Sequence, residues 1–211
     1  MAGRRAHPEA IDSDAAEWGV AGMAMPGNKV SGDLQVVAPR PGGMLAGLID
    51  GLGHGSEAAE AARIAGAMIR ARSAEPVDRI ILACHDALRT TRGAVMALAS
   101  LDGGECSMEW LCVGNISGQF IGSASGARER LLDRGGVVGF KLPALRPRKL
   151  PLGAGDLLIF MSDGVRDDLS EVELGASPQR IADDILRRGA RGNDDALVLV
   201  VRWMGRRPPK S

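Results

Sequence analysis

Short apolar runs separated by glycine- and proline-containing turns fill much of this chain, and each run has the length of a β-strand. The runs predicted as strands are residues 17–25, 33–38, 44–50, 94–101, 106–114, 116–123, 156–164 and 194–203. Asp102, Gly103 and Gly104 are expected to join two of them as a hairpin. Because the strands follow one another in hairpin order, we expect mostly antiparallel sheet with helices outside, an α+β fold rather than a doubly wound parallel sheet.

Helical patterns occur between these runs. The alanine-rich segment from Ser56 is predicted to be a helix with Ser56 as its N-cap, and a second helix is predicted from Val77 to about Thr90. A third is predicted to be capped by Ser177 and to end at Gly189. Residues 139–155 are proline-rich and basic, which predicts a loop or irregular extended chain.

Length and composition set the remaining limits. The 211 residues favour one domain, predicted at 15–204, between flexible tails at 1–14 and 205–211. Lysine plus arginine and aspartate plus glutamate both total 26, so the charge balance does not indicate a nucleic-acid partner. Three cysteines in no metal-ligand spacing favour a reducing compartment. We find neither a signal peptide nor a run near the roughly 20 apolar residues of a membrane span, and expect a cytoplasmic protein with no membrane association.

Four lone aspartates mark the ends of apolar runs. Asp33 and Asp194 begin predicted strands, whereas Asp50 and Asp163 end them. In an antiparallel sheet the start of one strand lies beside the end of its neighbour, so all four can meet at one edge. Clustered carboxylates must take up protons or bind cations, and oxygen ligands select hard ions such as Mg²⁺ or Mn²⁺. Each aspartate alone could equally be a turn or capping residue.

The glycine-rich segment 50–55 (DGLGHG) allows a second hypothesis, a nucleotide-binding enzyme. Gly51, Gly53 and Gly55 lie between a predicted strand and a predicted helix. The dinucleotide-binding pattern GxGxxG, however, needs its third glycine where Ser56 stands. It also has no place for a carboxylate such as Asp50 ahead of the first glycine, so the match is partial.

SGD at 31–33, DGLGHG at 50–55, SDG at 162–164 and NDDA at 193–196 resemble, in order and spacing, the motifs of the PPM family of metal-dependent Ser/Thr protein phosphatases. Over roughly residues 18–202 the chain is similar to the SpoIIE-type branch of that family and to its short RsbX-like members in stress signalling. The resemblance implies a four-layer α/β/β/α sandwich. It also implies a centre for two divalent cations, with Mn²⁺ preferred or Mg²⁺ in its place.

The resemblance also implies roles for individual residues. Asp50 would bridge both ions, the Gly51 carbonyl would bind one, and Asp163 and Asp194 would bind the other. Asp33 would act on a metal or its waters, and Asp195 is a weaker alternative to Asp194. The implied reaction is hydrolysis of phosphoserine or phosphothreonine by a metal-activated water.

Two residues have open roles. His54 could protonate the leaving seryl oxygen or could only orient the glycine loop. Well-known relatives carry a phosphate-binding arginine ahead of the first motif, whereas here Lys29 is the nearest cation before SGD. Leu197 stands where SpoIIE-type members often have threonine.

The resemblance further implies phosphorylated STAS-domain proteins, RsbR- or RsbS-like, as substrates of a monomeric enzyme that opposes an RsbT-like kinase. Four basic residues in the predicted loop could steer an acidic partner, or could be ordinary solvated side chains. They are Lys141, Arg146, Arg148 and Lys149. A catalytically inactive interaction module on the same fold is the other alternative, and metal-dependent release of phosphate distinguishes the two.

Overall fold

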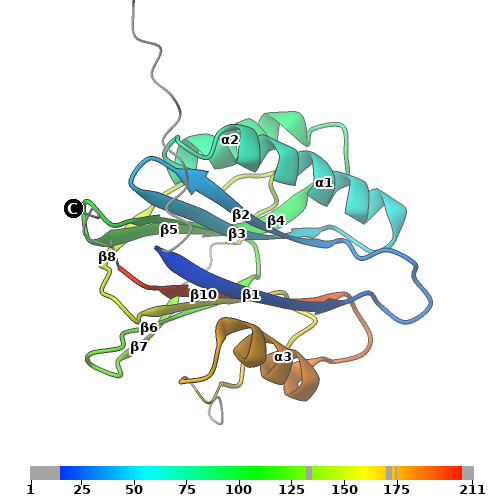
Figure 1. Cartoon of the computed structure of the whole chain (residues 1–211). Coiled ribbons are helices and arrows are strands. Elements are labelled where there is room, and N and C mark those ends of the chain that lie inside the picture. Colours follow the sequence, from blue (N-terminus) through cyan, green and yellow to red (C-terminus); the bar gives the residue numbers. More distant parts are fainter. Residues whose placement is uncertain (1–14, 132–134, 170–172, 174, 206–211) are drawn as a thin grey trace, which may run out of the picture.

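The computed structural model describes most of the chain, namely residues 15–131, 135–169, 173 and 175–205. The predicted tails, 1–14 and 205–211, lie outside the described residues apart from Gly205. Within the described part, the strands form two five-stranded sheets stacked face to face (Figure 1). Every pairing between neighbouring strands is antiparallel, as the hairpin order of the sequence predicts.

The two sheets differ in which parts of the chain they contain. The sheet that we call the β3 sheet has the strand order β2-β3-β4-β5-β8. Its strands are β2 (Asp33–Arg40), β3 (Gly43–Gly51), β4 (Ala94–Asp102), β5 (Ser107–Val113) and β8 (Arg148–Pro151). The other, the β10 sheet, has the order β1-β10-β9-β6-β7. Its strands are β1 (Ala16–Met23), β6 (Ser117–Ile121), β7 (Arg128–Leu131), β9 (Leu157–Met161) and β10 (Ala196–Trp203).

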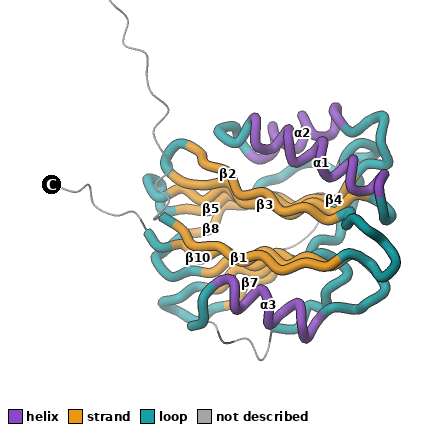
Figure 2. Tube along the Cα trace, turned by 45° about the vertical axis from the view of Figure 1, so that its right-hand side comes forward, coloured by secondary structure: helices purple, strands orange, loops and turns teal. Residues whose placement is uncertain are grey.

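Helices cover the outer face of each sheet. Helices α1 (Ser56–Ala71) and α2 (Val77–Ala87) lie over the β3 sheet, and α3 (Pro178–Gly189) lies over the β10 sheet (Figure 2). The predicted four-layer α/β/β/α sandwich is therefore confirmed. No helix among the described residues has both the length and the apolar character needed to cross a bilayer.

Strand β3 shows why the sequence contains continuous apolar runs. Its residues Ala46 and Leu48 face the core between the sheets, whereas Leu45 and Ile49 face the core beneath α1 and α2. Both faces of the strand are thus shielded from water. Full burial of each leucine or isoleucine side chain stabilises the folded state by about 1.5–3 kcal/mol. A third core fills the space between the β10 sheet and α3.

The helix ends differ from prediction in two places. Helix α2 ends at Ala87 and not at about Thr90. Ser56 is the first residue of α1, and the N-cap is Gly55, at φ 77° and without a side-chain cap. The glycine turn enters the helix through a left-handed residue, which shifts the cap one position earlier. The Ser177 cap of α3 is confirmed, since its side chain accepts a hydrogen bond from the Arg180 N–H at 3.4 Å, and α3 ends at Gly189 as predicted.

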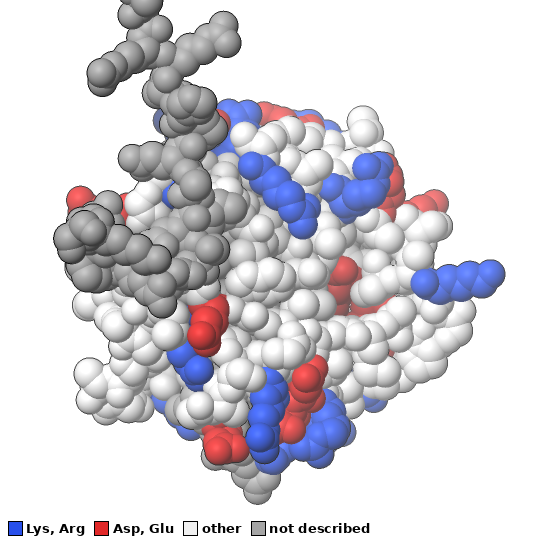
Figure 3. Space-filling model, viewed as in Figure 1, with Lys and Arg blue, Asp and Glu red and all other residues white. Residues whose placement is uncertain are grey.

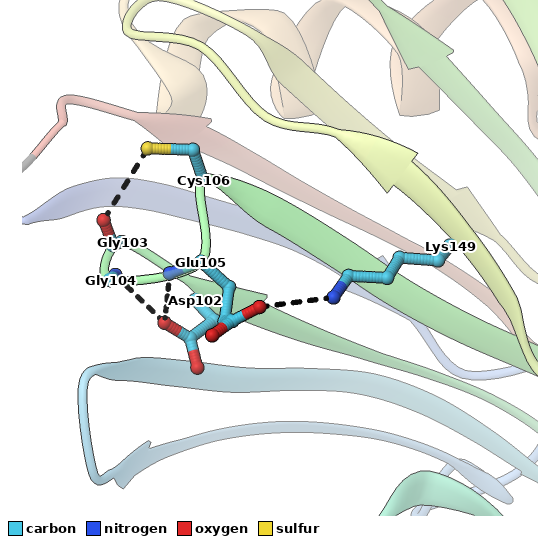
Figure 4. Close-up of polar contacts among 6 residues, drawn as sticks. All are labelled: Asp102, Gly103, Gly104, Glu105, Cys106 and Lys149. Atoms are coloured by element: carbon cyan, nitrogen blue, oxygen red, sulfur yellow. Dashed lines mark hydrogen bonds and ion pairs between the residues drawn. The ribbon is translucent and has the colours of Figure 1, made fainter.

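Strand prediction fails at two of the four sheet edges. Strand β7 was not predicted, and β8 lies within the segment predicted as loop. Both are four residues long and largely exposed, so they lack the apolar alternation that marks an inner strand. The hairpin between β4 and β5 is confirmed: Asp102 pairs with Ser107, and its Oδ1 accepts the N–H groups of Gly104 and Glu105 at 2.8 and 3.0 Å (Figure 4).

Candidate metal centre

The four aspartates meet at one end of the sandwich, and we call Asp33, Asp50, Asp163 and Asp194 the aspartate cluster. Asp33 opens β2 and is the register partner of Asp50 in β3. Asp163 follows β9 and Asp194 precedes β10, so these two belong to the opposite sheet. The cluster therefore forms between two facing sheets. The sequence argument expected the four aspartates to meet along one sheet edge, and it is wrong on this point. Acidic side chains are visible in a recess between the sheets, on the right of Figure 3.

The electrostatics of Asp50 and Asp33 show how unfavourable their charges are. Burial, together with the negative charges of Asp33, Asp163, Asp194 and Asp195, raises the pKa of Asp50 to about 8, and burial is the largest of these causes. The pKa of Asp33 is raised to about 7, mainly by burial; a hydrogen bond from Ser162 lowers it, and the neighbouring carboxylates raise it. Without a cation both groups therefore take up protons at a higher pH than an ordinary aspartate does, and a bound divalent ion would replace those protons.

The donor set of this cavity fits hard divalent cations. Asp50, Asp163 and Asp194 line a cavity of about 480 Å³ at this end of the sandwich. Asp33 Oδ2 is buried and has no hydrogen-bond partner among the described residues, which leaves it available as a ligand. All of these donors are carboxylate oxygens. Among the described residues, no three Asp, Glu, His or Cys side chains lie in an arrangement that could hold a metal ion as it stands.

Asp195 has a different environment from Asp194. Its two carboxylate oxygens accept the backbone N–H groups of Met25 at 2.7 Å and Gly32 at 2.6 Å. Its own N–H donates to Asp194 Oδ1 at 2.8 Å. Asp195 therefore ties the β1–β2 loop to the start of β10 and orients Asp194, while Asp194 lines the cavity.

Gly51 lies where no side chain fits. A Cβ at this position would be 2.1 Å from the Ala58 carbonyl oxygen, in the first turn of α1. The Gly51 N–H donates to the Gly32 carbonyl at 3.0 Å, which joins the two ends of β2 and β3 beside the cluster. The close approach of α1 to this strand end explains the glycine that directly follows Asp50.

His54 lines the large cavity and its side chain is exposed, which is compatible with either of its two predicted roles. Lys29 is exposed in the β1–β2 loop and does not line this cavity. Asn28, beside it, has a buried Nδ2 for which the described part of the chain offers no hydrogen-bond partner. The structure thus brings His54 to the cluster but leaves Lys29 outside the cavity wall.

The four basic residues of segment 139–155 do not form one surface. Lys141 forms a β-bridge with Val137, which lines the large cavity, and Arg146 is exposed in the following loop. Arg148 and Lys149, however, belong to β8 and pair with Glu129 and Glu105, each at 3.4 Å.

The position of Lys149 can be followed in Figure 4, where it contacts the β4–β5 turn. In the β3–β4 register Asp50 pairs with Val95 at the cluster end, and Gly43 pairs with Asp102 at the opposite end. At about 3.3 Å per residue these ends are roughly 23 Å apart. The predicted single basic loop is therefore wrong for Arg148 and Lys149, because pairing with β5 draws them along the sheet.

Sequence reasoning missed two polar residues beside the cluster. Asn115 Nδ2 donates to Asp163 Oδ2 at 2.8 Å, and Asn115 lines the large cavity. Ser162 is buried, accepts the Leu197 N–H on its hydroxyl at 2.8 Å and is hydrogen-bonded to Asp33. Ser162 directly precedes Asp163 and could have been found from that. Asn115 follows a glycine in what reads as an ordinary turn, and only the tertiary structure places it.

Known proteins resemble this chain in sequence and in fold. The family model described as Stage II sporulation protein E (SpoIIE) matches residues 40–204, a range that contains Asp50, Asp163 and Asp194 but not Asp33. Phosphoserine phosphatase RsbX of Bacillus subtilis (strain 168) is 25% identical over 177 residues, which cover 82% of this chain and 88% of that protein.

Solved structures agree with the sequence matches. A chain from work on the bacterial stressosome, described as a modular system adapted to control secondary messenger signalling, superposes with a TM-score of 0.82 at 30% identity, over 89% of this chain and 99% of that one. RsbX in complex with magnesium superposes with a TM-score of 0.80 at 20% identity, over 89% and 95%. Since the family model spans well over half of the 211 residues, this chain belongs to the SpoIIE family of protein phosphatases.

Proposed function

We propose that this chain hydrolyses phosphoserine and phosphothreonine on proteins with two divalent cations held at the aspartate cluster. Asp50 would bridge the ions, Gly51 would contribute its carbonyl, and Asp163 and Asp194 would complete the sites. Asp33 would bind a metal or its waters. When bound, the cations supply Lewis-acid activation of water and neutralise the phosphoryl charge.

The chain's own residues would have distinct tasks around that centre. Asn115 fixes the Asp163 carboxylate through the 2.8 Å hydrogen bond, and Asp195 orients Asp194 through its backbone N–H. His54, exposed on the wall of the same cavity, would donate a proton to the leaving seryl or threonyl oxygen. No covalent phosphoenzyme is required.

The proposed substrates are phosphorylated STAS-domain proteins of a stress-signalling module, with an RsbT-like kinase as the opposing enzyme. Two similarities support this proposal: the 25% sequence identity to phosphoserine phosphatase RsbX and the superposition on the chain from the stressosome work. We propose Mn²⁺ as the preferred ion, with Mg²⁺ as its substitute.

One observation carries the proposal: the partly buried carboxyl groups of Asp33 and Asp50 are register partners with pKa values raised to about 7 and about 8, and Asp50 lines one cavity with the carboxylates of Asp163 and Asp194. Such a site costs folding energy unless it binds cations. The same charges disfavour the alternative nucleotide site, because Asp50 would repel a pyrophosphate at the glycine loop.

The test is phosphate release from p-nitrophenyl phosphate and from a phosphorylated STAS-domain protein, with Mn²⁺, with Mg²⁺ and with EDTA. We expect release on both substrates with either cation and none with EDTA. Absence of metal-dependent release on both would favour the inactive-module alternative. Release from the aryl phosphate alone would overturn the substrate assignment but not the phosphatase assignment.

A further inference from the structure

A second, smaller cavity adjoins the large one. It measures about 170 Å³, and the residues that matter here are Asn115, Arg130, Asp163, Asp167 and Arg191, all on its wall. Asn115 and Asp163 also line the large cavity, so the two share a wall at the aspartate cluster. The smaller cavity has room for one side chain and not for a larger element.

The two arginines of this cavity differ in their partners. Asp167 accepts hydrogen bonds from Ser117 Oγ and Gln119 Nε2, both at 2.7 Å, and its Oδ2 pairs with Arg130 at 2.7 Å. The charge of Arg130 is therefore already balanced. Among the described residues Arg191 makes no such ion pair, although its backbone N–H is fixed to the Gly164 carbonyl at 2.9 Å.

The balance of charge in the cavity favours an anion. Its wall carries two arginines and two aspartates, of which Arg130 and Asp167 neutralise each other. Asp163 belongs to the aspartate cluster and would be compensated by bound cations in the proposed function. The guanidinium of Arg191 is then the uncompensated charge, next to the place where the phosphorylated residue would enter.

Arg191 lines the smaller cavity and not the large one. Arg191 therefore lies in the cavity that adjoins the aspartate cluster, and not in the cavity where the phosphoryl group would lie. We propose that the smaller cavity receives an aspartate or glutamate side chain within two residues of the phosphorylated serine or threonine, held by Arg191. This inference rests on the proposed function and makes Arg191 a specificity-determining residue.

The test uses phosphoserine peptides of one neutral host sequence, with aspartate, asparagine or lysine at −2, −1, +1 or +2. We expect the wild-type protein with Mn²⁺ to prefer aspartate at one of these positions by about fivefold in kcat/KM, near the upper end for an exposed ion pair. Arg191→Gln should abolish that preference, and Arg191→Glu should shift it to lysine at the same position. Arg166→Gln is the matched control, because Arg166 is exposed and near Asp163 in sequence but lines neither cavity.

The possible outcomes separate the inference from the function on which it rests. Equal rates on aspartate and asparagine peptides at all four positions would overturn the inference and leave the phosphatase in place. A parallel loss on p-nitrophenyl phosphate in Arg191→Gln would overturn it too, because Arg191 would then act on the phosphate itself. No hydrolysis of any substrate by the wild-type protein would refute the proposed function, and the inference with it.

Discussion

Replacing Asp50 by asparagine is expected to stabilise the metal-free protein while removing its phosphatase activity. Burial, together with the neighbouring negative charges, raises the pKa of Asp50 from its ordinary value of 3.8 to about 8. The folded protein therefore binds more protons than the unfolded chain between about pH 4 and pH 8. The contribution of this group to stability is complete below pH 4 and is lost as pH rises through 8.

The size of the effect follows from that shift. At about 1.4 kcal/mol per pH unit, the full difference corresponds to about 5–6 kcal/mol. Asp50 is only partly buried by surface area and is coupled to its acidic neighbours, so solvent screening reduces the cost, and we expect about 2 kcal/mol. For a chain of this length that corresponds to a rise in Tm of roughly 4–8 °C in Asp50→Asn at pH 8.

Thermal unfolding in EDTA between pH 5 and pH 9 measures this directly. The wild-type Tm should fall with rising pH, and the Tm of Asp50→Asn should fall less. Excess Mn²⁺ should stabilise the wild-type protein and have little effect on the variant. The control is Asp86→Asn, an exposed aspartate on α2 that should change neither property. A variant that melts at or below the wild-type temperature in EDTA at pH 8, or that remains active with saturating Mn²⁺, would refute the reasoning.

Three further substitutions test individual roles. His54→Ala should lower turnover on a phosphoserine protein by roughly 10² and much less on p-nitrophenyl phosphate, whose leaving group needs little protonation; equal losses would indicate a structural role. Asn115→Ala should raise the Mn²⁺ concentration for half-maximal activity by about tenfold, since Asp163 loses its orienting partner, and an unchanged metal titration would contradict this. Lys141→Ser should lower kcat/KM on an acidic phosphoprotein more at low salt, whereas Lys149→Ser should not, because Lys149 lies at the far end of the sheet; equal effects would count against this placement.

The local sequence pattern was sufficient to predict the inner strands and the helices of the fold. Strand β3 is apolar along its length because both of its faces are covered, and the Ser177 cap and Gly189 end of α3 follow from the chemistry of helix termini. The edge strands β7 and β8 could not be predicted in this way. Both strands are short and largely exposed, so they lack the apolar alternation that marks an inner strand, and β8 pairs with β5, which lies far before it in the chain.

The same division holds for the candidate site. The sequence by itself determined the identity of the aspartate cluster, because lone carboxylates at the ends of buried strands are unfavourable without a cation. Only the tertiary structure decided that Asp33 and Asp50 face Asp163 and Asp194 across two sheets, that Asn115 holds Asp163, and that Arg191 lines a second cavity beside them. These contacts join residues tens of positions apart, and their geometry depends on how the two sheets stack, which no local pattern of residues encodes.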